Sequence, residues 1–336
     1  MTGFPVTDST LSAVHLALFV KEKYGLSENT SCKIFRTGIN HTYMISDNED
    51  KYVLRIYSYN WRTETEIMEE LRLLILLKDN HINVSYPIKD KAKNYINTLQ
   101  APEGFRYAVL FSFAEGKKVR NLTEKTCYII GSLMANIHKT TINQKINRIE
   151  YNANTLTQLP YQYATKHFSE SVEEMQFVKR AGEHLTTLFG KVNSDKLRYG
   201  VVHLDLWYDN MSIEDESVIT VFDFDFCGNG WLLLDIAYFT MQLFNTEPDA
   251  KLFKSKVESF YNGYQKVTPI SNEEKALIPE AGLAIWIFYL GVQSQRFDNW
   301  SNIFLSENYL KHFIGIIKNW MKYNEIEIKE DYEIYV

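Results

Sequence analysis

The chain has 336 residues, of which 45% are hydrophobic and 14% aromatic, and its formal net charge is −6 at pH 7. This composition is too apolar for an intrinsically disordered chain, and the length suffices for one large domain or for two lobes around a cleft. No stripe of Lys and Arg dominates any segment, so we expect no nucleic-acid partner.

Several features of the sequence indicate a cytoplasmic protein. Cys32, Cys127 and Cys227 are far apart and form no CxxC pair, so we expect reduced thiols rather than a zinc site or a disulfide framework. The N-terminal region lacks the basic and apolar segments of a signal peptide. The longest apolar stretches, such as ALIPEAGLAIWIFYLGV, contain Pro, Glu and Gly and are too short to span a bilayer, so we expect no membrane association.

The N-terminal third of the sequence predicts a sheet with one inserted helix. It begins with an amphipathic helix from about Asp8 to Lys23, with Ser9 or Thr10 near the N-cap. SCKIFRTGINHTYMISDNEDKYVLRIY predicts two or three strands, because SDNED is a turn signal between apolar runs. TETEIMEELRLLILLKDN has helical spacing, and NVSYPIKD, NYINTLQ and RYAVLFSF are further strand candidates. These elements predict a small α+β lobe with a mostly antiparallel sheet.

From Thr123 onward the pattern is mainly helical. EKTCYIIGSLMANIHKTT and ESVEEMQFVKRAGEHLTTLFGKV are each apolar on one face, and further helical patterns follow LLLDIAYF. FAEGKKV, just past Phe113, is the natural join between the two patterns. We therefore predict two lobes, at residues 1–113 and 114–336.

Residues 203–226, HLDLWYDNMSIEDESVITVFDFDF, place several polar side chains around a short apolar run. Buried carboxylates are costly unless a metal, a cation or a proton lies between them. Phosphoryl transfer needs a carboxylate that accepts the proton of the attacking hydroxyl, and oxygen ligands that hold Mg²⁺ against nucleotide phosphates. In this pattern Asp205 supplies the base, and Asn210 and Asp223 supply the metal ligands. The run VITVF predicts a short strand that holds Asp223 at its end.

Each fragment of this motif has an ordinary structural explanation on its own. A lone His-x-Asp usually belongs to a loop, and an Asp after a strand is usually a turn residue or a helix cap. The fragments together, in this order and with a β-rich lobe before them and helices after them, match the catalytic-loop and metal-Asp logic of kinases.

The stretch VVHLDLWYDN…VFDFDFCGNGWLLLDIAYF resembles the aminoglycoside phosphotransferase/choline kinase-like family, which includes homoserine-kinase-type enzymes and a bacterial stress-response Ser/Thr kinase. YVLRIY, GSLMANIH and FYNGY resemble further segments of that family, so the resemblance runs over most of the chain. It implies an α+β class: a bilobal, protein-kinase-like fold. The small antiparallel-sheet N-lobe would bind nucleotide, and the larger, mainly helical C-lobe would carry the catalytic and substrate-binding residues.

The resemblance also implies roles for individual residues. Asp205 would be the catalytic base, and Asn210 and Asp223 the ligands of Mg²⁺. Asp225 is a further metal candidate, either as a ligand of a second ion or as a group that supports the first.

Two neighbouring residues are expected to act structurally. We predict that His203 braces the loop, and that Asp235 caps its helix and anchors the catalytic loop through backbone hydrogen bonds. Only FDFCGNGWLLL separates Asp223 from Asp235, so no activation-loop signature of a phospho-regulated protein kinase is present.

On the nucleotide side, Arg55 lies in the middle of the predicted strand YVLRIY. A cation buried in a strand needs an anion, and nucleotide phosphates or a helix Glu would serve. Glu70 best matches the family's helix Glu, with Glu66 and Glu69 as competitors. An Arg that faces solvent from an edge strand is the alternative. Many kinases of this fold carry Lys here, and Arg is not an interchangeable substitute.

Two other segments are nucleotide-binding candidates. Gly38 and Asn40, in the turn FRTGINHTY, are placed to offer backbone N–H groups to phosphate, although the turn has no repeated Gly pattern. Phe111, Ser112 and Phe113 are expected to grip the adenine through backbone groups.

For the acceptor, Trp207 and Tyr208 beside Asp205 are the substrate-binding candidates, because aromatic faces suit cationic or sugar-like ligands. Aromatic residues at helical spacing more often belong to a core, and we expect this of most of the others: Trp231, Tyr261, Tyr264, Trp286 and Tyr289.

The sequence thus predicts an ATP- and Mg²⁺-dependent phosphotransferase that acts on a hydroxyl of a small molecule: an aminoglycoside, an amino alcohol, an amino acid or a sugar. One alternative is a bacterial protein Ser/Thr kinase of the stress-response type. Another is a non-catalytic nucleotide-binding scaffold, against which the presence of Asp205, Asn210 and Asp223 together argues. The oligomeric state stays open.

Overall fold

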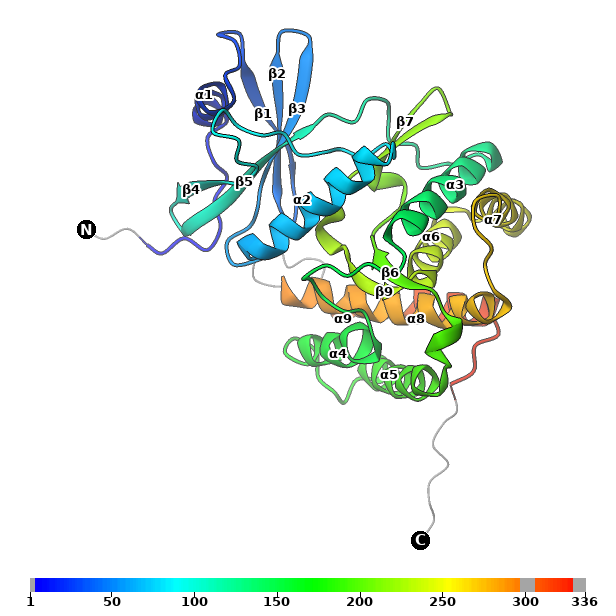
Figure 1. Ribbon diagram of the computed structural model, residues 1–336. Helices are drawn as coiled ribbons and strands as arrows, with labels where there is room; N and C mark the ends of the chain where they lie inside the picture. Colours follow the sequence, from blue (N-terminus) through cyan, green and yellow to red (C-terminus); the bar gives the residue numbers. More distant parts are fainter. Residues whose placement is uncertain (1–3, 297–305, 329–336) are drawn as a thin grey trace. The chain divides into compact units, whose positions relative to one another are not determined.

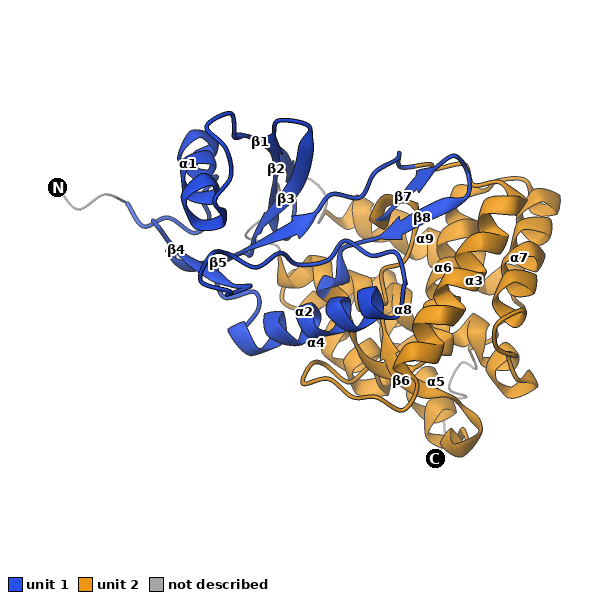
Figure 2. Ribbon diagram, turned by 45° about the horizontal axis from the view of Figure 1, so that its top comes forward, with its two compact units in different colours: residues 1–118, 211–225 blue, residues 119–210, 226–336 orange. Residues whose placement is uncertain are grey.

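The computed structural model describes residues 4–296 and 306–328. Its contacts divide the chain into two compact units (Figure 2). Unit 1 comprises residues 1–118 and 211–225, and unit 2 comprises residues 119–210 and 226–336.

Unit 1 is built on a five-stranded antiparallel sheet (Figure 1). Its strands, in the spatial order β1-β2-β3-β5-β4, are β1 (Ser31–Thr37), β2 (His41–Asp47), β3 (Asp50–Ile56), β4 (Asn97–Ala101) and β5 (Gly104–Ser112). The unit also contains α1 (Ala13–Tyr24), α2 (Glu64–Asp79) and a hairpin of β7 (Met211–Glu214) and β8 (Val218–Val221). The predicted α+β lobe with an antiparallel sheet is confirmed.

The two faces of β3 serve different purposes. Leu54 and Ile56 belong to a core cluster that includes Leu16 and Val20 of α1. Because successive side chains of a strand point to opposite faces, Arg55 between them points away from this cluster. The residue before Arg55 and the residue after it thus stabilise the sheet, and Arg55 itself is presented to α2.

The first helix begins later than predicted. α1 starts at Ala13 with Ser12 at its N-cap, rather than near Ser9 or Thr10. The reason is that Ser9 has another partner: its N–H and its hydroxyl donate to the Glu103 carboxylate at 3.2 and 2.7 Å.

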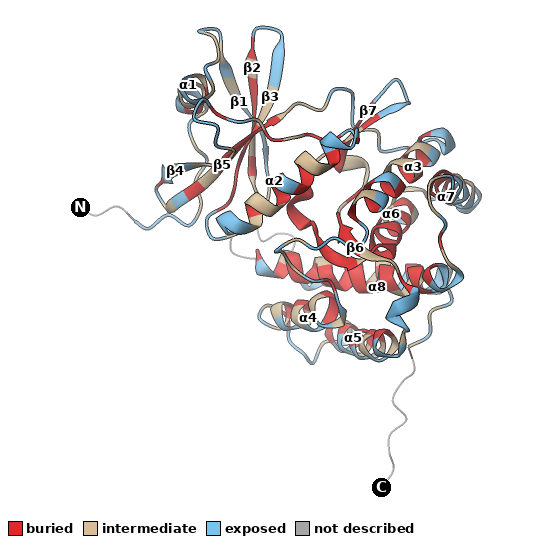
Figure 3. Cartoon of the chain, in the orientation of Figure 1, coloured by how far each residue is buried: buried red, intermediate tan, exposed pale blue. Residues whose placement is uncertain are grey.

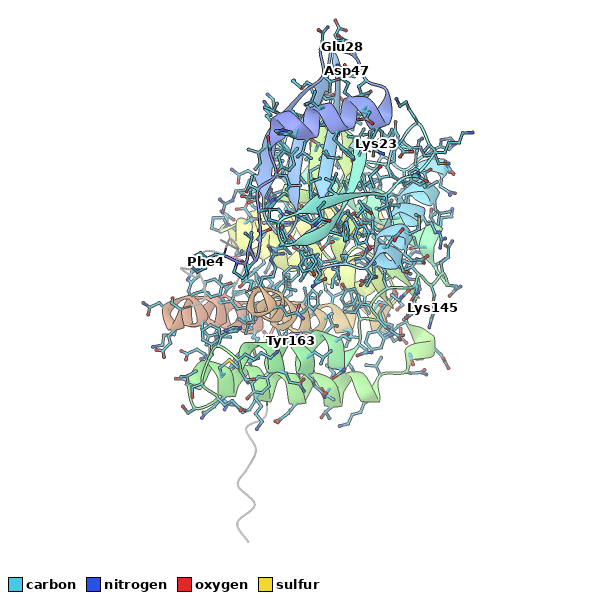
Figure 4. All side chains as sticks on the ribbon, turned by 90° about the vertical axis from the view of Figure 1, so that its left-hand side faces the viewer. Phe4, Lys23, Glu28, Asp47, Lys145 and Tyr163 are labelled. Atoms are coloured by element: carbon cyan, nitrogen blue, oxygen red, sulfur yellow. The ribbon has the colours of Figure 1, made fainter. Side chains whose placement is uncertain are left out.

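The loop that follows α1 is tied to the sheet by Asp47, at the end of β2. Its carboxylate accepts from the Ser27 N–H and from the Thr30 hydroxyl, each at 3.1 Å. Figure 4 shows Asp47 near Glu28 at this end of the unit. This end of the sheet is therefore closed by side-chain hydrogen bonds.

The segment NVSYPIKD, predicted as a strand, forms only isolated bridges. Pro87 has no N–H to donate to a ladder, so a regular strand is interrupted there. The segment joins the hairpin instead: the Ser85 N–H donates to the Val221 carbonyl at 2.9 Å, and the Val221 N–H donates to the Asn83 carbonyl at 3.0 Å. These contacts group residues 211–225 with the sheet, whereas the predicted division at residue 113 left them with the C-terminal lobe.

Unit 2 is mainly helical, as predicted. Its helices and strands are α3 (Glu124–Thr141), α4 (Leu159–Ala164), α5 (Glu173–Lys191), β6 (Tyr199–Val202), β9 (Gly228–Trp231), α6 (Leu233–Thr246), α7 (Ala250–Gln265), α8 (Asn272–Gln295) and α9 (Glu307–Tyr323). Its short turns are a π-helical turn at Asn154–Gln158 and 3₁₀ turns at Ser194–Lys196 and Tyr208–Asn210, and a further 3₁₀ turn, Phe224–Phe226, lies where the chain passes from unit 1 to unit 2. β6 and β9 pair antiparallel, and they lie just before and just after the segment 203–226 in the sequence.

Two glycines let α3 and α7 approach closely. A Cβ added at Gly131 of α3 would lie 2.1 Å from the Phe260 carbonyl oxygen, and one at Gly263 of α7 would lie 1.9 Å from the Tyr128 carbonyl oxygen. These are the glycines of GSLMANIH and FYNGY, so the two segments meet in the folded unit. Any side chain at either position would push the helices apart.

α8 corrects one sequence expectation. At 24 residues, with a mean hydropathy of 1.4 over its apolar window, it is long and apolar enough to cross a membrane by length and composition. Of that window, 72% is buried within the protein, and Figure 3 shows α8 buried along most of its length. Its burial, rather than its length, identifies it as a core helix of unit 2.

Candidate active site

The loop after β6 carries Asp205 in a strained and well-anchored backbone. Leu204 has φ 58°, a left-handed conformation that costs a non-Gly residue about 1–3 kcal/mol. The Asp235 carboxylate accepts from the His203 N–H at 2.9 Å and from the Leu204 N–H at 2.6 Å. The Tyr289 hydroxyl donates to the Leu204 carbonyl at 2.9 Å. These three bonds hold the loop in the conformation that presents Asp205.

Asp235 therefore anchors the loop of Asp205 through backbone hydrogen bonds, as predicted, but it does not cap its helix. The N-cap of α6 is Leu232, with no side-chain cap bond, and Asp235 lies within the first turn. A carboxylate that accepts backbone N–H groups of the loop is turned away from the N–H groups of its own helix.

Asp235 is held in turn by His138, which the sequence did not assign to the site. The His138 Nε2 lies 3.0 Å from Asp235 Oδ2, and its Nδ1 lies 2.7 Å from the Tyr264 hydroxyl. Burial alone would raise the pKa of Asp235, but His138 and His203 outweigh it, so the pKa is lowered. The only signal for His138 was its place at the end of GSLMANIH.

The Asp205 carboxylate is oriented by a phenol and an amide. Oδ1 accepts from the Tyr238 hydroxyl at 2.5 Å, and Oδ2 accepts from the Asn210 Nδ2 at 2.7 Å. The Asp205 N–H donates to the His203 Nδ1 at 3.1 Å, which is the bracing contact predicted for that histidine. Burial and the Asp205 charge raise the pKa of Tyr238 well above its usual value, so it stays a donor.

The same contacts orient Asn210. Its Nδ2 also donates to the Asp205 backbone carbonyl at 3.0 Å, so the amide nitrogen faces Asp205 and the Oδ1 faces away. Within residues 4–296 and 306–328 no hydrogen-bond donor reaches that Oδ1. Unit 2 thus combines an oriented carboxylate with an amide oxygen that is available to a ligand.

In unit 1, Arg55 joins two carboxylates. Its Nη1 donates to Glu70 Oε1 at 2.9 Å, and its Nη2 donates to Asp223 Oδ1 at 3.0 Å. The Tyr57 hydroxyl donates to Glu70 Oε2 at 3.2 Å. Burial disfavours the charge of Arg55, but Asp223 and Glu70 outweigh this, so the pKa of Arg55 is raised.

Glu70 is the helix Glu that pairs with Arg55, and its competitors have other partners. Glu66 completes a capping box with Thr63 at the start of α2. Glu69 accepts from the exposed Arg72 at 2.5 Å.

Asp223 follows β8 and also has a left-handed backbone, with φ 65°. Its side chain is 39% exposed, and Arg55 contacts only its Oδ1. No donor in the described part of the chain reaches the Oδ2. An open carboxylate oxygen beside a fixed guanidinium suits a hard cation with phosphate ligands.

Asp225 is placed differently. It is 2% exposed, and its carboxylate accepts from Trp61 and Arg62, two residues for which no sequence pattern predicted a role. The arginine is 163 positions away in the sequence, which is why no spacing could reveal the contact.

The turn with Gly38 and Asn40 is tied to the chain after β3. The Asn40 Oδ1 accepts from the Ser58 N–H at 3.1 Å, and the Ser58 hydroxyl donates to the Ile39 carbonyl. A Cβ at Gly38 would lie 3.9 Å from the Asn40 carbonyl oxygen, an ordinary van der Waals distance, so close packing does not require glycine at this position.

Of the three predicted adenine-contacting residues, Ser112 already uses its backbone groups. Its N–H donates to the Tyr86 carbonyl at 2.9 Å, and its carbonyl accepts from the Ser85 hydroxyl at 2.6 Å. Phe111 lies in the ladder with β3. The N–H and carbonyl of Phe113 have no hydrogen-bonding partner among the described residues.

Trp207 and Tyr208 lie in unit 2 with their rings 4.7 Å apart, edge to face. They line a shallow hollow with Gln242, whose amide donates to the Tyr238 hydroxyl at 3.4 Å. Tyr238 in turn donates to Asp205, so Gln242 and Tyr238 connect the hollow to the Asp205 carboxylate by hydrogen bonds. The other aromatic candidates have packing or hydrogen-bonding roles. Tyr261, whose ring packs against Phe260, also lines a separate pocket of about 270 Å³ between α7, α8 and α9.

No group of three or more His, Cys, Asp and Glu side chains that could hold a metal occurs among the described residues. This is compatible with Mg²⁺, which needs only one or two protein oxygens when phosphates and waters supply the rest. The open Oδ atoms of Asn210 and Asp223 are oxygens of that kind.

The fold is shared with several solved structures. A microcompartment-associated aminopropanol kinase is 20% identical, with a TM-score of 0.76, over 94% of this chain and 100% of that one. The amicoumacin kinase hAmiN, in complex with AMP-PNP, Ca²⁺ and Ami, is 19% identical, with a TM-score of 0.75, over 92% and 94% of the two chains. The predicted α+β, kinase-like fold is confirmed.

The sequence comparisons lead to the same group of enzymes. A homoserine kinase of Bradyrhizobium diazoefficiens is 25% identical over 296 residues, which cover 87% of this chain and 86% of that protein. The family described as "Phosphotransferase enzyme family" matches residues 31–270, well over half of the chain. The chain therefore belongs to the Phosphotransferase enzyme family, and it is a kinase.

Proposed function

We propose that this kinase transfers the γ-phosphoryl group of ATP to a hydroxyl group of a small molecule, with Mg²⁺ as the cofactor. The observation that carries the proposal is the oriented carboxylate of Asp205, which is fixed by Tyr238 and Asn210 on a loop anchored by Asp235. A general base must be held where it can reach the proton of the attacking hydroxyl.

In the proposed step, the acceptor oxygen forms a bond to the γ-phosphorus while the bond from that phosphorus to the bridging oxygen of ADP breaks. The proton of the hydroxyl passes to the Asp205 carboxylate. Asn210 and Tyr238 donate to that carboxylate and keep it aimed at the acceptor. No covalent intermediate is needed, since positioning and charge neutralisation supply most of the catalysis of such transfers.

We assign the metal site to the Asn210 Oδ1 and the Asp223 Oδ2. Both are hard oxygen donors without a described protein partner, and Asn210 immediately precedes the hairpin that ends near Asp223. When bound, Mg²⁺ would neutralise phosphate charge there.

For the nucleotide, we assign Arg55 to the phosphates, because its guanidinium is held in place by Glu70. The turn at Gly38 and Asn40 would cover the phosphates with backbone N–H groups, as the family resemblance implies. Among the candidates for the adenine contact, Phe113 is favoured because its backbone groups have no described partner, whereas those of Ser112 are in use.

For the acceptor, we infer a compact amino alcohol or hydroxy amino acid, bound near Trp207 and Tyr208. Relatives named for homoserine and for aminopropanol support this class, since both compounds carry one hydroxyl and one amine on a short chain. The described cysteines, Cys32, Cys127 and Cys227, form no disulfide bond, which is compatible with action in the reducing cytoplasm.

The experiment is a measurement of ADP release with a panel of amino alcohols, hydroxy amino acids, sugars, aminoglycosides and generic protein substrates. We expect turnover with a small hydroxyl compound. Asp205→Asn should lose ~10²-fold or more of that turnover while ATP still binds. The matched control is Asp195→Asn, an exposed carboxylate elsewhere in unit 2. Unchanged turnover in Asp205→Asn would remove Asp205 from this role, and a total lack of Mg²⁺-dependent turnover would favour a binding scaffold.

A further inference from the structure

Both carboxylate oxygens of Asp225 accept hydrogen bonds from one short segment. The Trp61 Nε1 donates to Oδ2 at 2.7 Å, and the Arg62 Nε and Nη2 lie 3.3 Å from Oδ1 and Oδ2. The Arg62 Nη2 also donates to the Asp225 backbone carbonyl at 2.7 Å. The carboxylate is 4% exposed and the arginine side chain 14%, so solvent screens this pair only weakly.

The donors of this contact are themselves fixed. Arg62 lies over the Trp61 ring, 4.9 Å from its centroid. Its Nη1 lies 3.7 Å from a Glu66 oxygen, and Glu66 completes the capping box with Thr63 at the start of α2. The contact to Asp225 therefore continues directly into the N-terminus of a helix.

The segment 223–225 is thus connected to the region of α2 at two points within unit 1. The first is the pair of Asp225 and Arg62, which lies just before the N-cap residue Thr63. The second lies further along, where Glu70 holds Arg55 and Arg55 contacts Asp223. Two attachments to one short segment restrict its rotation more than either one alone.

Asp223 needs such restriction because of its backbone. Its φ of 65° is uncommon for a residue with a side chain, and such conformations persist only where the surroundings impose them. Asp225 is two residues away, and the Arg62 contact fixes both its side chain and its carbonyl.

We propose that Trp61 and Arg62 form a clamp on Asp225 that positions the Asp223 carboxylate for Mg²⁺. In this arrangement Asp225 is a positioning residue, and it is not the ligand of a second metal ion. The proposal rests on the proposed function, in which Asp223 binds Mg²⁺.

The experiment measures ATP affinity with and without Mg²⁺ in Arg62→Gln, Arg62→Lys, Asp225→Asn and Asp223→Ala, after thermal unfolding has shown which variants fold. The control is Arg72→Gln, an exposed arginine on α2 whose only described pairing is with Glu69. We expect the Mg²⁺-dependent gain in affinity to fall ~10-fold in Arg62→Gln and Asp225→Asn. Arg62→Lys should retain part of the Mg²⁺-dependent gain, because Lys keeps the positive charge but lacks the planar guanidinium that makes several hydrogen bonds at once. ATP binding without Mg²⁺ and the Arg72→Gln control should stay unchanged.

A second readout counts Mn²⁺ ions bound per chain in the presence of a nonhydrolysable ATP analogue. The clamp predicts the same number in the wild type and in Asp225→Asn. Loss of one ion in Asp225→Asn would make Asp225 a metal ligand and overturn the proposal. The clamp would also be overturned if the folded Arg62 variants kept the full Mg²⁺-dependent gain in ATP affinity while Asp223→Ala lost that gain. The proposed function would survive this outcome. If Asp223→Ala kept the Mg²⁺ effect, the metal assignment would fail, and the clamp with it.

Discussion

The acidic residues of the segment 203–226 are held in chemically different ways in the two units. In unit 2 the oxygens of Asp205 accept from a phenol and an amide, Tyr238 and Asn210. In unit 1 the oxygens of Asp223 and Asp225 accept from guanidinium groups. Neutral donors orient a carboxylate without cancelling its charge, whereas a guanidinium also compensates it. The first setting suits the proton acceptor that we propose, and the second suits carboxylates that stay ionised beside the phosphates and the cation that we propose for unit 1.

This difference predicts different costs when each partner is removed. The largest effect is expected at Arg55, since Glu70 is fully buried. Arg55→Ala leaves that carboxylate without its cation and should lower the free energy of unfolding by about 3–5 kcal/mol, measured by urea titration. The double variant Arg55→Met, Glu70→Leu should recover most of the loss. If the double variant were no more stable than Arg55→Ala, the cost would not come from an uncompensated charge.

A smaller effect is expected at Asp235, which accepts from backbone N–H groups and from His138. Asp235→Asn should cost about 1.5–3 kcal/mol at pH 7. Because the pKa of Asp235 is lowered in the folded state, its contribution is present at neutral pH and is lost as the pH falls below the ordinary Asp value of about 3.9. The variant should therefore differ most from the wild type at neutral pH and converge with it in acid. A constant difference across the acid range would contradict this.

The smallest effect is expected at Tyr238. Tyr238→Phe removes one hydrogen bond to Asp205 and should cost about 0.5–1.5 kcal/mol at neutral pH. The pKa of Tyr238 is raised in the folded state, so the wild type should lose part of its stability as the pH rises above about 10, where this tyrosine ionises only in the unfolded chain. The variant should show a shallower alkaline loss in stability measurements from pH 8 to 11. If the free energy of unfolding fell equally steeply with pH in the wild type and in the variant, Tyr238 would not be the cause of the alkaline loss.

The parts of the site that the sequence predicted are the local ones. Asp205 and Asn210 lie within one short loop, and the match of Glu70 to the family's helix Glu was enough to favour it over its neighbours. The hydrophobic periodicity of strands and helices likewise predicted the sheet unit and the helical unit, because each pattern depends on near neighbours in the chain.

The parts that it missed depend on contacts between distant segments. Trp61 and Arg62 meet Asp225 across more than 160 positions, and His138 meets Asp235 across 97. Apart from the place of His138 at the end of GSLMANIH, no local pattern distinguishes such residues from ordinary surface or core residues. The cap predicted for Asp235 failed for the same reason, since the backbone of a distant loop competes for its oxygens.

The hairpin 211–225 has a consequence for how the protein is made. Backbone hydrogen bonds join Val221 to Asn83 and Ser85, and Lys117 to Ile213, so the sheet unit lacks partners until synthesis has passed position 225. The whole first stretch of unit 2, residues 119–210, is synthesised before that point, although domains generally fold in order from the N-terminus. A fragment that ends at Lys118 would expose those unpaired edges, and we expect it to aggregate rather than fold as an independent nucleotide-binding module.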